Sequence, residues 1–199
     1  MITAATETLL GGVRMSLLAE QLVDEWLNRN GFFTLQGIKS GVHEIDLLGI
    51  RMSKGHLEGW HVECQVSFRP VSYIGKLSKA HQKKLGAMGP HSAMKRPSSV
   101  IEASIDEWVE NKFRSPKKKG MRDLCWQGID WQFKFVHGKV HDKSELAFMK
   151  ARGVELISFE KVLHELCAHK PGELFGGAGT DIAEIVQYYA EYAETARRE

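Results

Sequence analysis

The sequence predicts an α/β domain in which helices flank a central mixed β-sheet. Stretches with helical apolar periodicity, stretches that alternate like strands, and helix-capping signals give the order α-β-β-β-α-β-α-β-α-α. This order contains both strands that follow one another through turns and strands separated by helices, so the sheet is expected to be mixed. The 199 residues suffice for one domain with a hydrophobic core.

The N-terminal elements are predicted from apolar spacing and from glycines. Apolar side chains recur at helical spacing up to Gly31, which ends the first helix as a C-cap glycine would. The residues that follow alternate between apolar and polar types, which is typical of strands joined by turns. We expect a helix over 15–29, strands over 32–36, 44–50 and 60–68, a turn over 37–41, and a polar hairpin loop over 52–59.

The C-terminal elements are predicted mainly from capping pairs, in which Ser or Asp precedes Glu by three residues. The helices are expected within 74–85 and over 99–113, 142–153, 158–168 and 181–197, the strands over 131–136 and 154–157, and a basic loop over 115–122. The whole chain, 1–199, is expected to form a single domain. It carries a basic insertion at about 69–97 and a helical C-terminal extension at about 170–199.

The basic residues are concentrated in two segments of an otherwise acidic chain. Residues 64–101 contain seven Lys or Arg and no Asp or Glu, and residues 112–122 contain six and none. An isolated run of lysines is often only a solvated surface. Two acid-free basic stretches in one domain favour a polyanionic partner.

Several classes of protein are disfavoured by what the sequence lacks. No window approaches the eighteen apolar residues of a membrane span, and the first residues show no basic and apolar leader. The three cysteines, Cys64, Cys125 and Cys167, fit neither a disulfide framework nor a CxxC zinc site. We therefore expect a cytoplasmic protein that does not act in a membrane.

Two acidic residues in neighbouring apolar strands are the strongest chemical signal. Asp46 lies in the strand over 44–50, and Glu63 lies seventeen positions later in the returning strand. Burying a carboxylate in an apolar strand is costly unless it is paired or binds a metal. Strands joined by a hairpin pair with each other, so both carboxylates are expected to meet at one point and to suit a hard cation such as Mg²⁺. Alternation places Gln65 on the same face as Glu63.

Residues 15–68 resemble the core of the PD-(D/E)XK nuclease superfamily. The resemblance consists of a helix with Ala19-Glu20, a turn, the strand motif E-I-D-L, a hairpin, and V-E-x-Q around Glu63. It is similar in style to the restriction-endonuclease-like and Holliday-junction-resolvase-like branches. It implies a restriction-endonuclease-like three-layer fold with a central mixed sheet.

The resemblance also implies an active site. In this family the positions of Asp46 and Glu63, with the backbone carbonyl of Cys64, hold Mg²⁺, for which Mn²⁺ can substitute. Gln65 stands where the family usually has Lys, and can hold an attacking water by hydrogen bonds. Glu20 corresponds to the helix-borne glutamate of the family. Helical spacing alone would place it at the edge of the buried stripe.

DNA is the partner that the resemblance and the basic segments together imply. Lys and Arg contacts with backbone phosphates position a protein on DNA without reading its sequence. The candidate DNA-binding residues are Lys76, Lys79, Lys83, Lys84, Lys95, Arg96, Lys117, Lys118 and Lys119.

Three functions remain open at this stage. The first is a metal-dependent DNA endonuclease that hydrolyses phosphodiester bonds. The second is a catalytically inactive nuclease fold that serves as a DNA-binding or assembly module, which Gln65 favours. The third is an interaction subunit, as a homodimer or with a partner protein, that uses the final helix with Tyr188, Tyr189 and Tyr192.

Overall fold

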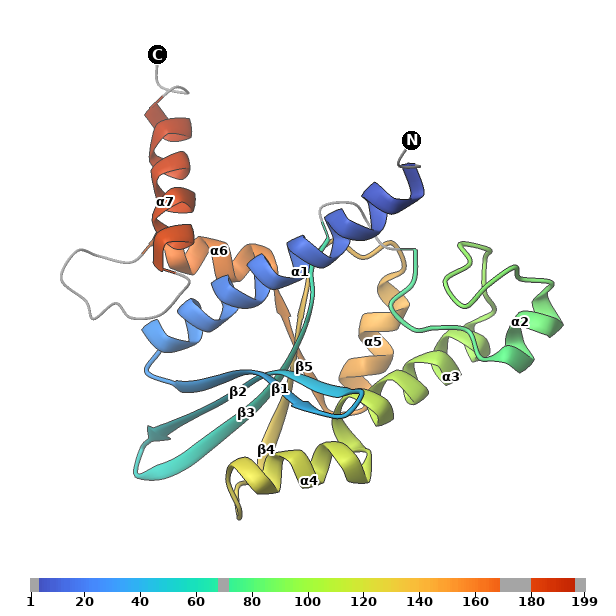
Figure 1. Ribbon diagram of the computed structural model, residues 1–199, viewed down its shortest axis with the longest axis horizontal. Helices are drawn as coiled ribbons and strands as arrows, with labels where there is room; N and C mark the ends of the chain where they lie inside the picture. The colour runs from blue at the N-terminus through green and yellow to red at the C-terminus, as the bar shows by residue number, and fades with distance from the viewer. Residues whose placement is uncertain (1–3, 68–71, 169–179, 196–199) are drawn as a thin grey trace.

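The structure is a computed structural model that describes the backbone of residues 4–67, 72–168 and 180–195, with side chains over 17–67, 72–168 and 181–188. Five strands form one sheet, and helices lie on both of its faces (Figure 1). The strands are β1 (Phe33–Ser40), β2 (His43–Ser53), β3 (His56–Gln65), β4 (Trp131–His137) and β5 (Val154–Ser158). The helices are α1 (Ala4–Arg29), α2 (Lys79–Leu85), α3 (Ser98–Val109), the π-helical turn η1 (Glu110–Arg114), α4 (Pro116–Cys125), α5 (Lys143–Ala151), α6 (Phe159–Cys167) and α7 (Thr180–Thr195).

The sheet is mixed, as predicted. Its strands lie in the order β1-β2-β3-β4-β5, with antiparallel pairing from β1 to β3 and parallel pairing from β3 to β5. The first three strands follow one another through tight turns, whereas β4 and β5 are reached through helical connections. Local turns close antiparallel pairs, and crossovers close parallel ones. The predicted α/β class is therefore confirmed.

Each face of the sheet has its own apolar core. The face under α1, α6 and α7 buries residues such as Val23, Leu27, Val62 and Val162. The opposite face is covered by α3, η1 and α5, with a separate small cluster under α4. Val62 lies on the α1 face, whereas the neighbouring His61 packs against Phe113 of η1 on the other face. This alternation in β3 sends Glu63 toward η1 and α4.

The hairpin between β2 and β3 is tighter than the loop predicted over 52–59. Ser53 pairs with His56, so only Lys54 and Gly55 form the turn. Both have positive φ, 50° and 80°, as the commonest two-residue hairpin turn requires. The neighbouring polar residues belong to the strands, where Arg51 bonds to Glu58 at 2.8 Å across the pair. Their polarity reflects an exposed strand end rather than a loop.

The basic segment over 115–122 is a helix, so the predicted loop is wrong. Ser115 caps α4 by accepting a hydrogen bond from the backbone N–H of Lys118, and Pro116 occupies the first helical turn. Lys118, Met121 and Arg122 lie three and four residues apart and are buried on one side of the helix. The lysine-rich composition concealed this buried stripe.

The helix predicted from a capping pair at Ser99 and Glu102 begins differently. Its N-cap is Pro97, which has no side-chain cap bond, and Glu102 instead pairs with Arg152 at 3.1 Å. The caps at Asp142 and Ser158 are confirmed, because each side chain accepts a bond from a backbone N–H of its own helix.

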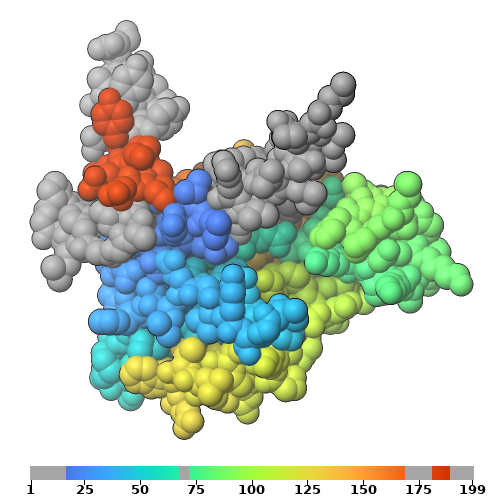
Figure 2. Space-filling model, in the orientation of Figure 1, coloured from blue at the N-terminus to red at the C-terminus, as the bar shows by residue number. Residues whose placement is uncertain are grey.

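The segment over 72–97, part of the basic insertion predicted at about 69–97, packs against the α3–α5 side and forms the green lobe of Figure 2. Ile74 and Leu77 are buried. The buried carboxylate of Glu145 in α5 accepts bonds from the backbone N–H groups of Ile74 (2.8 and 2.9 Å) and Gly75 (2.9 Å). Gly75 approaches α3 so closely that a Cβ would lie 2.9 Å from the Cβ of Ser104. The segment therefore has a defined position next to α3.

Among the described residues, none of the helices combines the length and the apolarity that a membrane span requires. In α7, Tyr188 is exposed. The side chains of Tyr189 and Tyr192 lie outside the described residues.

The anchor formed by Glu145 gives a first prediction. Glu145→Ala should lower the free energy of unfolding by about 3 kcal/mol, because two buried N–H groups lose a charged acceptor. Amide exchange at Ile74 and Gly75 should become faster. Urea unfolding and hydrogen exchange measure the two effects, with Lys150→Ala, an exposed change in α5, as the control. Wild-type stability and protection in Glu145→Ala would contradict the anchoring role.

Candidate functional site

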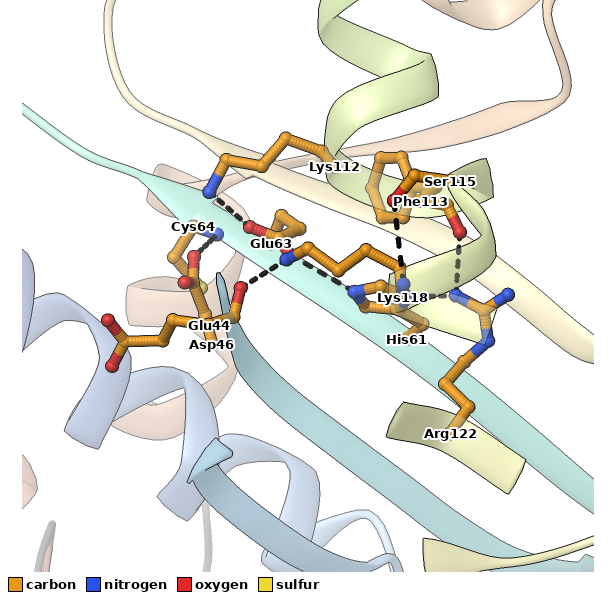
Figure 3. A network of polar contacts seen from close by, with 10 residues as sticks. All are labelled: Glu44, Asp46, His61, Glu63, Cys64, Lys112, Phe113, Ser115, Lys118 and Arg122. Carbon is orange, nitrogen blue, oxygen red and sulfur yellow. Dashed lines mark hydrogen bonds and ion pairs between the residues drawn. The ribbon is translucent and has the colours of Figure 1, made fainter. Parts of the chain in front are cut away.

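Asp46 and Glu63 lie on adjacent antiparallel strands. Leu47 of β2 and Val62 of β3 form the last pair of their ladder, and Asp46 and Glu63 are the next residues along the two strands. The carboxylate Oδ2 of Asp46 accepts a hydrogen bond from the backbone N–H of Cys64 at 2.8 Å (Figure 3). The two acidic side chains thus belong to one network of polar contacts at the end of β3.

An irregularity in β2 explains how Asp46 reaches the neighbouring strand. Ile45 and Leu48 both pack on the α4 side of the sheet, although strict alternation would place residues three apart on opposite faces. Leu47 points to the α1 side. The alternation is therefore interrupted at Asp46, where the side chain takes the place of a backbone acceptor for β3.

Glu63 is the centre of the network. Its side chain is only 1% exposed. Two lysines and one histidine surround it as hydrogen-bond donors. Lys118 lies 3.0 Å from Oε1, His61 lies 3.1 Å from the same oxygen, and Lys112 contacts Oε2. A buried carboxylate is costly unless its oxygens are satisfied, and here both oxygens are.

The two lysines come from either side of one bend in the chain. Lys112 belongs to η1, and Lys118 belongs to α4, which starts after Ser115. Phe113 between them is fully buried and stacks on Phe133 of β4. This aromatic anchor fixes the bend against the sheet. Single π-helical turns occur frequently at functional sites.

Lys112 and Lys118 differ in their access to solvent. The Lys112 side chain is 37% exposed, whereas that of Lys118 is 4% exposed. Lys118 also donates to the backbone carbonyl of Glu44 in β2. Lys118 therefore joins β2, β3 and α4, while Lys112 lies at the opening of the site.

His61 is held as a neutral ring in one tautomer. Arg122 lies 2.9 Å from its Nδ1, and an arginine side chain has no acceptor, so Nδ1 must accept. Nε2 then carries the hydrogen and donates to Glu63. Burial lowers the pKa of His61 well below its usual value, and the positive charges of Arg122, Lys118 and Lys112 lower it further. Arg122 also donates to the carbonyl of Phe113 at 2.6 Å. The hydrogen bonds that connect Arg122, His61 and Glu63 are therefore anchored at the bend.

Asp46 and Lys112 also have shifted pKa values. Burial raises the pKa of Asp46 to about 6, and repulsion from Glu63 adds to the increase, while Lys112 opposes it. For Lys112, burial acts to lower the pKa, but attraction to Glu63 and Asp46 outweighs it, so the pKa is raised. The carboxylates and the lysine therefore lie close enough to interact strongly.

Gln65 and Glu20 both lie near this network. Gln65 is half-buried and lines, together with Lys112, a cavity of about 340 Å³ on the α3 side. Glu20 on α1 is half-buried too, and its charge contributes to raising the pKa of the Cys64 thiol, after burial and Asp46. Glu20 therefore lies on the part of α1 near the end of β3, and its role in the site stays a prediction.

The backbone carbonyl of Cys64 faces the strand that carries Asp46. The carbonyl of Gln65 accepts a bond from Gly138, which follows β4, at 3.2 Å. Successive carbonyls of a strand point to opposite sides, so that of Cys64 points toward β2. Two carboxylates and this carbonyl are hard oxygen donors, which is the chemistry that Mg²⁺ prefers. The repulsion between Asp46 and Glu63 is also what a cation would relieve.

The donor set is small. Within the described part of the chain, no group of three or more His, Cys, Asp and Glu side chains is arranged to hold a metal ion. A cation at Asp46 and Glu63 would use two side chains and a backbone carbonyl, with the remaining positions left to water or substrate, as is common for Mg²⁺.

Two of the predicted DNA-binding residues are buried. Lys118 forms an ion pair with Glu63. The guanidinium of Arg96 donates hydrogen bonds to the carbonyls of Gly75 (2.7 Å), Pro90 (3.4 Å) and Ser92 (3.2 Å). Neither is available to a phosphate at the surface. The exposed candidates are Lys76, Lys79, Lys83, Lys84, Lys95, Lys117 and Lys119.

Sequence reasoning missed Lys112, His61 and Arg122. His61 and Arg122 are not spaced as in any known sequence motif. Lys112 follows an acidic helical segment, whose composition is typical of an exposed surface. The one available signal was the helical start Ser115-Pro116, which would have made the lysine-rich segment a helix with an inner side.

No family model matches the chain, and a search of curated proteins finds no match. A search of solved structures finds similarity to the crystal structure of a protein of unknown function, AF1548, with 16% identity and a TM-score of 0.44. The alignment covers 74% of this chain and 66% of the other, just under two thirds of its length. Similarity at this level carries no argument about function, which therefore rests on the geometry above.

The buried pair of Glu63 and Lys118 gives a second prediction. Lys118→Met should lower the free energy of unfolding by about 3 kcal/mol, because it leaves a buried carboxylate with fewer donors. Combining Lys118→Met with Glu63→Gln should recover at least about 1 kcal/mol relative to the sum of the single changes. Lys117→Met, one residue away and exposed, should stay within about 0.5 kcal/mol of wild type. Additive single changes in urea unfolding would show that the pair is not coupled.

The neutral state of His61 gives a third prediction. The unfolded chain protonates this histidine below about pH 6.5, while the folded chain resists protonation. Its contribution to stability is therefore complete above pH 6.5 and falls with decreasing pH, by up to roughly 1.4 kcal/mol per pH unit. His61→Gln removes the titration, so its stability should fall less between pH 7 and pH 5. Parallel pH profiles for the two proteins would exclude a buried neutral His61.

Proposed function

We propose that this chain is a metal-dependent DNA endonuclease that hydrolyses phosphodiester bonds. The observation that carries the proposal is the meeting of Asp46 and Glu63 from adjacent strands with Lys112 at an accessible edge. Paired carboxylates beside a lysine combine a cation site with a positive charge for a phosphate. The resemblance of residues 15–68 to PD-(D/E)XK nucleases supports the same assignment, with a restriction-endonuclease-like fold.

Asp46, Glu63 and the carbonyl of Cys64 would hold Mg²⁺. When bound, the cation would lower the pKa of water beside it and offset charge on the phosphate. Gln65 would hold the attacking water by hydrogen bonds, since its amide both donates and accepts. The hydrogen bonds from Arg122 to His61 and from His61 to Glu63 fix the orientation of the Glu63 carboxylate.

Lysines from other elements supply the positive charge that Gln65 lacks at the position where the nuclease family usually has Lys. Lys112 is the better candidate to contact a phosphate, because it is partly exposed and lies beside both Gln65 and Glu63. Lys118 is too deeply buried to meet substrate and holds Glu63 in place. Exposed lysines of the segment over 72–97 and of α4 would contact backbone phosphates.

A catalytically inactive DNA-binding module is the second candidate. It is favoured by the engagement of both oxygens of Glu63 with lysines, which already balances the charge that a cation would balance. The two candidates differ in their requirement for divalent metal.

Cleavage assays with Mg²⁺ or Mn²⁺ on linear, supercoiled and branched DNA give the fourth prediction. Wild type should cleave at least one substrate, and Asp46→Ala should lower the rate by at least about a hundredfold, because the change removes a cation ligand. Gln65→Lys should retain cleavage. Lys112→Ala should lower the rate by about tenfold or more, since it removes charge stabilisation of the phosphate.

Glu44→Ala is the matched control, because it removes an exposed carboxylate two residues before Asp46 and should leave the rate unchanged. Metal-independent DNA binding without cleavage would favour the inactive module. Full activity in Asp46→Ala would place the metal site elsewhere.

A further inference from the structure

A cavity of about 340 Å³ adjoins the acidic pair on the α3 side of the sheet. Gln65 and Lys112 form the wall that it shares with the candidate catalytic site. Lys76 and His91 contribute from the segment over 72–97, and Trp108 and Asn111 from α3 and η1. The cavity thus connects the site to the basic segment.

The position of Lys76 and His91 is fixed by the protein. Arg96 bonds to the carbonyl of Gly75 and to those of Pro90 and Ser92, so it ties the residue before Lys76 to the residues on either side of His91. The backbone N–H of Leu77 also donates to the carbonyl of Pro90 at 2.9 Å. These bonds close the segment into a loop that presents both side chains to the cavity.

The cavity lining has more positive than negative charge. It contains two lysines, Lys76 and Lys112, and a single acidic residue, Glu107. Burial lowers the pKa of His91, and the positive charges of Lys76 and Arg96 lower it further, so His91 adds a neutral hydrogen-bonding group to this lining. An anion in the cavity would offset the repulsion between the charges of Lys76 and Lys112.

The aromatic part of the lining is suited to a base. Trp108 belongs to the lining, and T-shaped contacts with Phe113 and Phe135 hold the indole ring in place. Asn111 is exposed and offers both donors and an acceptor. Aromatic contact with a base contributes roughly 1–3 kcal/mol to single-strand binding.

We propose that this cavity binds one unpaired nucleotide of the DNA strand that is cut, with its phosphate toward Lys76 and Lys112 and its base toward Trp108 and Asn111. The volume is near the lower end of small-molecule sites and suits one nucleotide rather than a duplex. A base inside a duplex cannot enter such a cavity without leaving the stack. The substrate is therefore DNA with a single-stranded segment or end next to the scissile bond. This inference rests on the proposed function.

The test is binding in EDTA, which removes divalent metal and so separates recognition from cleavage. Fluorescence anisotropy measures affinity for a labelled 12-nucleotide single strand and for the corresponding 12-base-pair duplex. Lys76→Ala combined with Asn111→Ala should weaken single-strand binding about tenfold more than duplex binding. Lys76→Ala alone should make the log–log salt slope for the single strand shallower by about 0.7.

Lys83→Ala combined with Lys84→Ala is the control, because both lysines are exposed on α2 in the same segment but lie outside the cavity. It should leave the ratio of single-strand to duplex affinity unchanged. An equal effect of the cavity variant on both DNAs, or no effect, overturns the nucleotide site while leaving the nuclease proposal intact. Absence of binding to either DNA by wild type overturns both.

Discussion

The structure depends on how it satisfies one buried carboxylate. Glu63 lies in the middle strand of the sheet, and its donors come from β3 itself, η1 and α4. Because Lys118 also binds the carbonyl of Glu44, one side chain joins two strands and a helix. Any change that moves α4 takes Lys118, one of the donors, away from the buried carboxylate of Glu63, which is costly. The position of the bend at 110–116 is therefore set by charge as well as by packing.

The two lysines that contact Glu63 have different roles. Lys118 is buried and holds Glu63 in place, whereas Lys112 is partly exposed beside Gln65. A positive charge in this position need not come from the strand that carries Glu63. The glutamine at residue 65 is then compatible with an active site, since the neighbouring η1 turn supplies the charge. Lys112 also lines the cavity, so the proposed phosphate contact and the acidic pair are adjacent.

Much of the fold was predictable because it follows from local periodicity. Alternation from Trp60 correctly placed Val62 and Glu63 on opposite faces, and Ser158 correctly marked a helix start. The hairpin was predicted, but the strand pairing of most residues over 52–59 and the lysine-rich helix were not, since exposed strand ends and amphipathic basic helices resemble loops in composition. The donors of Glu63 were also not predictable. Lys118 lies fifty-five residues away along the chain, and only the packing of Phe113 on the sheet brings it close.

The measurement that most directly tests a cation site at Asp46 and Glu63 is the binding of Mn²⁺ to the protein without DNA, by calorimetry or electron paramagnetic resonance. One Mn²⁺ ion should bind per chain near neutral pH, where Asp46, with its pKa of about 6, is ionised. Asp46→Asn should abolish this binding and preserve the fold, while Glu44→Gln should not affect it. Unchanged Mn²⁺ binding in Asp46→Asn, or no binding by wild type, would contradict a metal-dependent site at these residues.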